Sequence, residues 1–372
     1  MLTDASRPAP DSIMLVTNTL EKSPSGGRQL LCKLNHDALA QIFGDRLVLF
    51  ELPQVPLRGA AAALAAFKGR IDGVTSASLS DALRAIRTNE VGLVFVDGSN
   101  LGGLVMAIKK NYPTVQVCTF FHNVEARFFL GAFKQFKTPR ALAVLLANYL
   151  AERKSVRYSD KIICLNQRDS RQLDRLYGRA ATHIAPMALQ DKLPNDRAAG
   201  DGAQGERYAL FVGGGFYANR AGIAWYAKNV APRILFKTII VGRGLEDLRD
   251  QLEATGNVEL VGEVASLAPW YLNSHVVIAP IFDGSGMKTK VAEALMFGKK
   301  VIGTPEAFSG YEEHAAVAGW VCFSADDFVA AITRAEAELS KPFDEELRAL
   351  YERNYSFEAA RNRLAGILGS AT

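Results

Sequence analysis

The chain has 372 residues, of which 49% are apolar, and a formal net charge of +4. This composition is typical of a globular protein, and the length favours two hydrophobic cores over one. No run approaches the roughly 20 apolar residues that span a membrane. Residues 1–10 lack the basic start and apolar centre of a signal peptide, so we expect a cytoplasmic protein.

The charge is unevenly divided along the chain. Residues 1–190 hold 24 Lys and Arg against 15 Asp and Glu, a net charge of +9, whereas residues 191–372 hold 19 against 24, a net charge of −5. A basic half suits an anionic membrane, an acidic substrate or nucleic acid, although scattered surface charge is the commoner cause. The four cysteines lie far apart in apolar surroundings, which indicates buried thiols rather than a zinc site or a disulfide scaffold.

Apolar runs alternate with helical segments through the first half of the chain. Strands are predicted at residues 12–17, 47–52, 91–96, 115–121 and 161–165. Helices are predicted at residues 29–43, 58–67, 80–87, 100–110, 139–158 and 169–177. This alternation predicts a parallel sheet that is covered on both faces.

The alternation stops at residues 193–205, which are polar, small and rich in glycine, as in a linker. It then resumes, with strands at residues 208–212, 238–241, 258–260, 276–279 and 300–303 and helices at 219–229, 245–252, 267–272 and within 325–370. We predict an N-terminal domain at 1–190, a linker at 191–206, a C-terminal domain at 207–354 and a last helix within 355–372 that could cross back. The fold class is α/β, with two Rossmann-like doubly wound domains that face across a ligand-binding cleft.

Residues 279–295 carry the strongest chemical signal in the sequence. A buried strand ends in a glycine loop, and a helix follows that opens with Lys288 and Lys290 and carries Glu293 a turn further on. Glycines let the backbone approach an anion, and the start of a helix attracts one. Lysines at that position oppose the helix dipole, so a phosphorylated ligand explains them better than a solvated helix start does. Glu293 could accept hydrogen bonds from sugar hydroxyls. Together, the glycine loop, the lysines and Glu293 predict a nucleotide-sugar site.

The second half resembles glycosyltransferases of the GT-B fold, of the family 4 type. Residues 211–214 with Asn219, residues 261–264 and the block 280–304 carry this resemblance, in matching order and spacing. The first half carries it more thinly, in the turn 25–28, in residues 122–125 after a strand, and around 159–169. The resemblance implies that Lys288 and Lys290 neutralise the donor diphosphate and that Glu293 binds the donor ribose.

The resemblance also implies roles for the glycine loops. Amides at Gly286 and Met287 would contact the phosphates. The nucleotide pocket would be lined by Gly213, Gly214, Gly215, Gly262 and Val264, and the pyrophosphate would be approached by Gly26 and Gly27. Glycine pairs are common turns at strand ends, so these loops are turns first and phosphate cradles second.

The sequence departs from the family pattern at one position. Ser285 stands where a glutamate usually precedes Glu293 by eight residues, and Asp283 or backbone amides could replace it. His122 would face the donor sugar, although a histidine at a strand end is as often satisfied by the backbone. Glu125 is a weaker candidate, because its role could be no more than to cap a helix or to pair with Arg127.

An aromatic and basic segment follows His122. Residues 127–137 contain Arg127, Phe128, Phe129 and Phe133 with two further cations, and they could form core or dock on an anionic membrane that carries a lipid-linked acceptor. We expect a hexosyltransferase, retaining more readily than inverting, that uses a UDP- or GDP-sugar in polysaccharide synthesis without a metal, a cofactor or a nucleic-acid partner. The enzyme would be cytoplasmic or peripheral on the inner face of the membrane. Its rivals are a nucleotide-sugar epimerase of the same fold and a non-catalytic binding protein.

Overall fold

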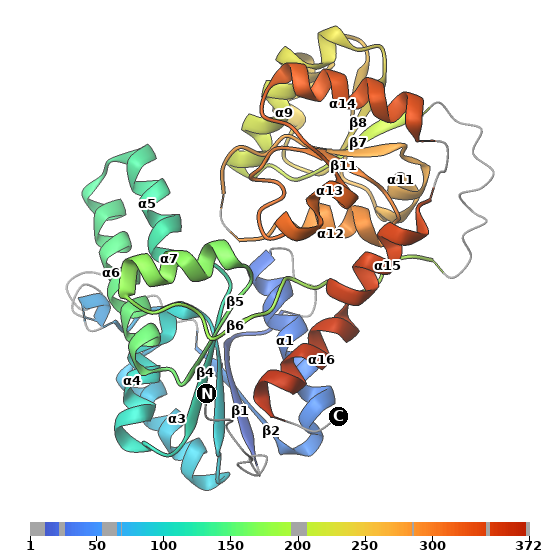
Figure 1. The fold of residues 1–372 in the computed structure, drawn as a ribbon. Coiled ribbons are helices and arrows are strands. Elements are labelled where there is room, and N and C mark those ends of the chain that lie inside the picture. The colour runs from blue at the N-terminus through green and yellow to red at the C-terminus, as the bar shows by residue number, and fades with distance from the viewer. Residues whose placement is uncertain are drawn as a thin grey trace. The chain divides into compact units, whose positions relative to one another are not determined.

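The structure is a computed structural model, and it describes residues 12–21, 27–53, 65–67, 69–194, 207–284, 286–339 and 343–369. The chain divides into two compact units, residues 1–187 with 357–372 and residues 188–356. Each unit contains one six-stranded sheet in which every strand pair is parallel. The two sheets and their helices confirm the predicted α/β class (Figure 1).

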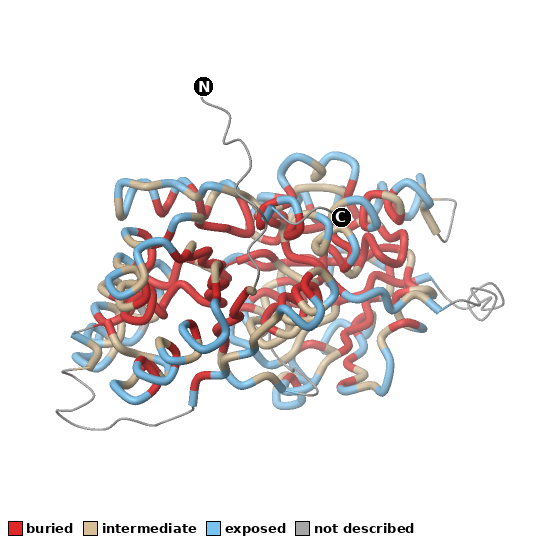
Figure 2. Tube along the Cα trace, turned by 90° about the horizontal axis from the view of Figure 1, so that it is seen from below, coloured by how far each residue is buried: buried red, intermediate tan, exposed pale blue. Residues whose placement is uncertain are grey.

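The first sheet has the strand order β2-β1-β3-β4-β5-β6. Its strands are β1 (Ile13–Asn18), β2 (Leu47–Leu52), β3 (Leu93–Asp97), β4 (Gln116–Phe121), β5 (Lys161–Cys164) and β6 (His183–Ile184). The central strands β1, β3 and β4 are almost wholly buried, as their continuous apolar runs predict for a sheet covered on both faces (Figure 2).

Helices cover both faces of this sheet. They are α1 (Gly27–Phe43), α3 (Ser76–Thr88), α4 (Gly102–Asn111), α5 (Glu125–Phe136), α6 (Pro139–Tyr158), α7 (Gln167–Tyr177) and α16 (Phe357–Leu368). Buried side chains of α3 and α4, such as Ile86 and Leu104, pack with Val16 and Val94 of the sheet. The last helix, α16, packs against α1, and the carbonyl oxygen of Ile367 accepts a 2.6 Å hydrogen bond from Lys161.

The second sheet has the strand order β12-β11-β10-β7-β8-β9. Its strands are β7 (Tyr208–Val212), β8 (Lys237–Val241), β9 (Val258–Gly262), β10 (Val276–Ala279), β11 (Val301–Gly303) and β12 (Gly319–Val321). The chain adds β8 and β9 on one side of β7, and then β10, β11 and β12 on its other side. The loops after β7 and β10 therefore lie at a topological switch point, where open parallel sheets bind ligands.

The helices of the second unit are α9 (Tyr217–Asn229), α10 (Arg249–Glu253), α11 (Ala268–Asn273), α12 (Thr289–Met296), α13 (Ala315–Ala318), α14 (Ala325–Glu338) and α15 (Glu345–Asn354). Helix α9 lies so close to the segment after β10 that a Cβ on Gly222 would come within 1.8 Å of the carbonyl oxygen of Pro280. Only glycine permits this approach, which brings the start of α9 beside the loop that leads to α12.

Two sequence predictions differ from the structure, and two others cannot be compared with it. The single helix expected at 245–252 is a 3₁₀ turn (Glu246–Leu248) followed by the short α10. The short strands β6 and β12 were not expected, because two or three residues carry no readable periodicity. Most of the helix predicted at 58–67 and most of the linker predicted at 191–206 lie outside the described residues.

Candidate active site

Lys290 is a buried cation of the second unit. It lies in the first turn of α12, is only 8% exposed, and donates a 2.9 Å hydrogen bond from Nζ to Oδ1 of Asn219 on α9. Its Nζ also lies 5.3 Å from the ring centroid of Phe211 on β7. Burial lowers the pKa of Lys290 to about 8, against the opposing effect of Glu293. A buried ammonium held in this way is an electrostatic site for an anion.

Lys288 precedes α12 and is held by an ion pair. Its Nζ lies 2.9 Å from Oε1 of Glu306 and also donates to the carbonyl oxygen of Gly286 at 3.3 Å. The backbone carbonyl of Lys288 accepts a hydrogen bond from the hydroxyl of Tyr311 at 2.9 Å. Glu306 follows β11 and was not among the residues that the sequence singled out. It therefore adds a carboxylate to the predicted phosphate site.

Glu293 is half-buried on α12 and accepts a 3.0 Å hydrogen bond from the hydroxyl of Tyr271. Burial and the nearby Glu293 raise the pKa of that hydroxyl well above its usual value, so Tyr271 stays a donor. The second carboxylate oxygen of Glu293 takes no hydrogen bond from the described residues. The side chain of Glu293 is therefore held in place by Tyr271, and its other carboxylate oxygen can accept a hydrogen bond from a ligand hydroxyl.

The glycine loops at this edge are bonded to one another. The amides of Gly213 and Gly215 donate 2.9 Å hydrogen bonds to the carbonyls of Val241 and Arg243, and a Cβ on Gly215 would come within 2.4 Å of the carbonyl of Gly244. This tight packing, with both amides already bonded, supports the interpretation of Gly213 and Gly215 as turn residues rather than as a phosphate cradle. The carbonyl of Gly214 accepts from Asn219, the residue that also holds Lys290.

The remaining donor-side candidates have ordinary surroundings. Gly262 ends β9 with φ +89°, and Val264 follows it half-buried. Asp283 is exposed and accepts a 3.2 Å hydrogen bond from Tyr217. Met287 is buried against Gly310, where a Cβ would come within 2.4 Å of its side chain. Ser285 and Gly26 lie outside the described residues, and Gly27 is the first residue of α1.

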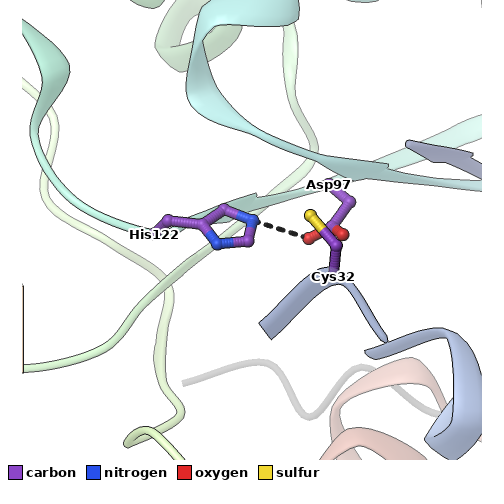
Figure 3. Close-up of side chains that lie close together, drawn as sticks. All are labelled: Cys32, Asp97 and His122. Carbon is purple, nitrogen blue, oxygen red and sulfur yellow. Dashed lines mark hydrogen bonds and ion pairs between the residues drawn. The ribbon is translucent and has the colours of Figure 1, made fainter. Parts of the chain in front are cut away.

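His122 lies at the carboxyl end of β4 in the first unit and contacts Asp97 at the end of β3. Its Nε2 is 2.8 Å from Oδ1 of Asp97 (Figure 3), and both side chains are buried. Asp97 also accepts from Asn35 at 2.9 Å and from Thr17 at 3.2 Å. Burial alone would raise the pKa of Asp97, but the electrostatic interaction with His122 and hydrogen bonds from His122, Cys32 and Asn35 outweigh it and lower that pKa. The Nδ1 of His122 has no hydrogen-bond partner among the described residues.

Cys32, Asp97 and His122 place their possible ligand atoms within 4.8 Å of one another, close enough to hold a metal ion (Figure 3). Burial raises the pKa of the Cys32 thiol, and the protonated sulfur shares a hydrogen bond with Asp97. Asp97 also accepts hydrogen bonds from His122, Asn35 and Thr17. We therefore interpret the cluster as a hydrogen-bonded carboxylate that orients His122. Asp97 was not among the site residues predicted from the sequence, although its place at the end of β3, next to β4, is a signal for it.

Glu125 begins α5 and is buried beside a second carboxylate. Its amide, and that of Ala126, donate to Glu152 on α6, which also accepts from Tyr177 at 2.7 Å. Burial raises the pKa of Glu125 to about 7, against the opposing effect of Arg28. The structure does not pair Glu125 with Arg127, which is exposed.

The aromatic segment forms most of α5. Phe128, Phe129 and Phe133 are half-buried, and the rings of Phe128 and Phe129 meet edge-on at 5.2 Å. Helix α5 packs along α6 (Figure 1). The large apolar side chains that reach solvent here are Leu130 (39% exposed), Phe136 (63%), Leu142 (40%) and Leu146 (52%). These four, rather than the three predicted phenylalanines, form the exposed apolar surface of the α5–α6 pair.

A family model described as glycosyl transferases group 1 matches residues 206–338, which include β7, the glycine loops and all of α12. Residues 206–338 therefore belong to the group 1 glycosyltransferase family. No curated protein matches this chain by sequence.

Solved structures show the GT-B fold of this chain. HepE of Anabaena in complex with UDP has 15% identity and a TM-score of 0.65 over 97% of this chain and 100% of HepE. WaaG, a glycosyltransferase involved in lipopolysaccharide biosynthesis, has 15% identity and a TM-score of 0.61 over 96% of this chain and 100% of WaaG. The lipopolysaccharide outer core galactosyltransferase WaaB has 14% identity and a TM-score of 0.63 over 97% of this chain and 100% of WaaB.

Proposed function

We propose that this glycosyltransferase moves a hexose from a nucleotide diphosphate sugar to a saccharide or lipid-linked acceptor in polysaccharide biosynthesis. The observation that supports this most is Lys290, a buried ammonium at the start of α12 beside the topological switch point of its sheet. HepE has been crystallised with UDP and with UDP-glucose, which favours a UDP-sugar over a GDP-sugar as donor.

The charges at α12 suit departure of a diphosphate. Lys290, Lys288 and the backbone amides at the start of the helix, near Gly286 and Met287, would stabilise the negative charge that develops on the leaving group. These groups supply the charge that a divalent cation supplies in other transferases, so we propose catalysis without a metal or cofactor. Glu293, fixed by Tyr271, would bind the donor ribose.

The acceptor-side residues belong to the first unit. His122, oriented by Asp97, would face the donor sugar, and its buried Nδ1 has no hydrogen-bond partner among the described residues. We propose retention of configuration, for which no protein base is required near the acceptor. An inverting reaction would need one, and Glu125, with its pKa of about 7, would then be a suitable group. NMR of the product's anomeric proton distinguishes the two outcomes.

Donor binding tests the proposal directly. Isothermal titration with UDP, GDP and ADP should show binding of UDP, and Lys290→Met should weaken it at least tenfold. The exposed Lys228 at the end of α9 offers a matched control, because Lys228→Met removes the same charge away from α12. Equal effects of the two variants, or the absence of binding by any nucleotide, would contradict a donor site at Lys290.

Two alternatives predict different turnover. A nucleotide-sugar epimerase converts the sugar nucleotide without an acceptor, and a binding protein releases no nucleotide at all. If the amount of UDP released from UDP-glucose rises when acceptor is added, the result supports a transferase over an epimerase and over a binding protein.

We also propose that the enzyme acts at the inner face of a membrane as a peripheral protein. Within the described residues, no helix is long and apolar enough to cross a bilayer. The exposed Leu130 and Phe136 on α5 lie among exposed cations, including Lys134 and Lys137, a combination that suits anionic lipid surfaces. Vesicles containing phosphatidylglycerol should sediment the protein but not a Leu130→Ser/Phe136→Ser variant. Leu235→Ser, which changes a fully exposed leucine of the second unit, is the control.

A further inference from the structure

The two lysines at the start of α12 are held by partners of different charge. Lys288 is paired with the carboxylate of Glu306 at 2.9 Å, which offsets its positive charge. Lys290 instead donates a 2.9 Å hydrogen bond to Oδ1 of Asn219, a neutral amide oxygen. A neutral acceptor directs an ammonium group without cancelling its charge. Lys290 therefore keeps more of its charge for a ligand than Lys288 does.

Asn219 is itself held in one orientation. It lies half-buried in the first turn of α9, and its Nδ2 donates a 3.1 Å hydrogen bond to the carbonyl oxygen of Gly214. Turning the amide over would place its oxygen against that carbonyl and its NH₂ group against the ammonium of Lys290. Both contacts would be repulsive, so Oδ1 stays directed at Lys290.

The loop after β7 leaves room for this contact. A Cβ on Gly213 would come within 2.9 Å of the ring of Phe211 and within 3.0 Å of Cγ of Asn219. Both of these side chains contact Nζ of Lys290, one through its ring face and the other through Oδ1. The lack of a side chain at Gly213 thus lets an aromatic ring and an amide approach the same ammonium. The amide of Gly213 is bonded to the carbonyl of Val241, which fixes the loop.

The charged groups that act on Lys290 lie along its own segment. Burial lowers the pKa of Lys290 to about 8, while Glu293 on α12 opposes this effect and Lys288 adds to it. The elements packed against its side chain, α9 and β7, present Asn219 and Phe211, which do not ionise. Near pH 8, the acceptor at Nζ should therefore decide how much of Lys290 is charged.

We infer that Asn219 is a positioning residue of the donor site, whose Oδ1 holds the ammonium of Lys290 in place and leaves its positive charge for the diphosphate. The inference rests on the proposed function, which puts the diphosphate at Lys290. Asn219 acts through Lys290 and needs no contact with the donor. A carboxylate at this position would neutralise Lys290, and an apolar side chain would leave the buried ammonium without its acceptor.

Two variants with opposite effects on Lys290 test the inference in the protein without UDP. Asn219→Leu removes the acceptor and should lower the pKa of Lys290 to about 7, whereas Asn219→Asp should raise it to about 9. The Cε–Hε signals of ¹³C-labelled lysine report this titration by NMR, and Lys290→Arg identifies the signal of Lys290. Asn229→Asp adds the same charge at the other end of α9 and should leave the titration unchanged.

The binding of UDP at pH 6 and pH 8 gives a second measurement. If only the charged form of Lys290 binds the diphosphate, these pKa values make the UDP affinity fall about twofold between the two pH values in wild type and about tenfold in Asn219→Leu. In Asn219→Asp this fall should be nearly absent, although binding should be weaker at both pH values because the carboxylate competes with phosphate. A purely structural role of Asn219 would change the affinity by the same factor at both pH values.

The inference is overturned if the titration of Lys290 is unchanged in both Asn219 variants, if it moves in the same direction in both, or if Asn229→Asp moves it equally. Thermal unfolding shows whether Asn219→Leu folds, and if it does not, the titration in the isosteric Asn219→Asp decides alone. If UDP binds to wild type but the titration does not move, only this inference fails. If the titration moves as expected but UDP does not bind, the hold on Lys290 stands and the proposed function fails.

Discussion

The ammonium of Lys288 lies 2.9 Å from Oε1 of Glu306, and the two side chains are only 12% and 19% exposed. A donor phosphate that approaches Lys288 therefore meets a cation that is already paired and a carboxylate that repels it. The ion pair is sheltered enough that salt screens it less than a surface pair.

Glu306→Gln should strengthen the binding of UDP. Removing one negative charge next to Lys288 should lower the Kd roughly fivefold, which corresponds to about 1 kcal/mol. Isothermal titration with UDP measures this, and uridine should show no change because it carries no phosphate. Glu313→Gln, an exposed change in the same segment, is the control. Weaker UDP binding in Glu306→Gln would instead mean that Glu306 itself contacts the donor.

Donor binding should depend on pH through Lys290. Because burial lowers its pKa to about 8, the empty site loses this positive charge as the pH rises from 7 to 9, and UDP affinity should fall over that interval. Arginine stays charged throughout, so Lys290→Arg should flatten the pH dependence even if it binds UDP less well. Titrations at pH 6.5, 7.5, 8.5 and 9.5 measure both profiles. A wild-type profile parallel to that of Lys290→Arg would exclude titration of Lys290 as the cause.

Asp97 should stabilise the first unit in a pH-dependent manner. Its pKa is lowered in the folded state, so its contribution is present above the unfolded-state pKa and is lost as the pH falls through the folded-state value. Asp97→Asn should cost about 3 kcal/mol near neutral pH, since it leaves the donors of His122 and Asn35 without a charged partner. Urea denaturation at pH 7 and pH 3.5 should show the difference from wild type shrinking in acid. Asp81→Asn should differ little from wild type at either pH.

Glu125 should have the opposite pH dependence. Its folded-state pKa is raised from 4.5 to about 7, so its contribution is intact below pH 4.5 and is lost as the pH rises through 7. Glu125→Gln removes the ionisation and should make the protein more stable than wild type at pH 8, by at most about 3 kcal/mol, but not at pH 4.5. Thermal unfolding at the two pH values measures this, with the exposed Glu90→Gln as control. A variant that is less stable than wild type at pH 8 would show that the ionised carboxylate is needed.

Much of the fold could be predicted from local pattern. The predicted helix at 139–158 has the bounds of α6, and the predicted strands at 47–52 and 208–212 have those of β2 and β7. Each depends on apolar spacing within the segment and on its bounding residues, such as Thr138, which caps α6, and Pro139, which begins it. Short segments without such signals, including β6 and β12, could not be predicted.

The sequence alone determined the alternation that gives two parallel sheets and placed Lys288, Lys290 and Glu293 at the start of one helix, because periodicity and helix-start chemistry act between near neighbours. Only the tertiary structure decided what these side chains contact. Lys290 meets Asn219 across 71 positions of sequence, Asp97 receives Asn35 from 62 positions away, and Arg28 meets Asp72 from 44 positions away. Such pairs join helices, turns and strand ends that follow different strands of one sheet, and which of these lie side by side is set by strand order, which no local pattern encodes.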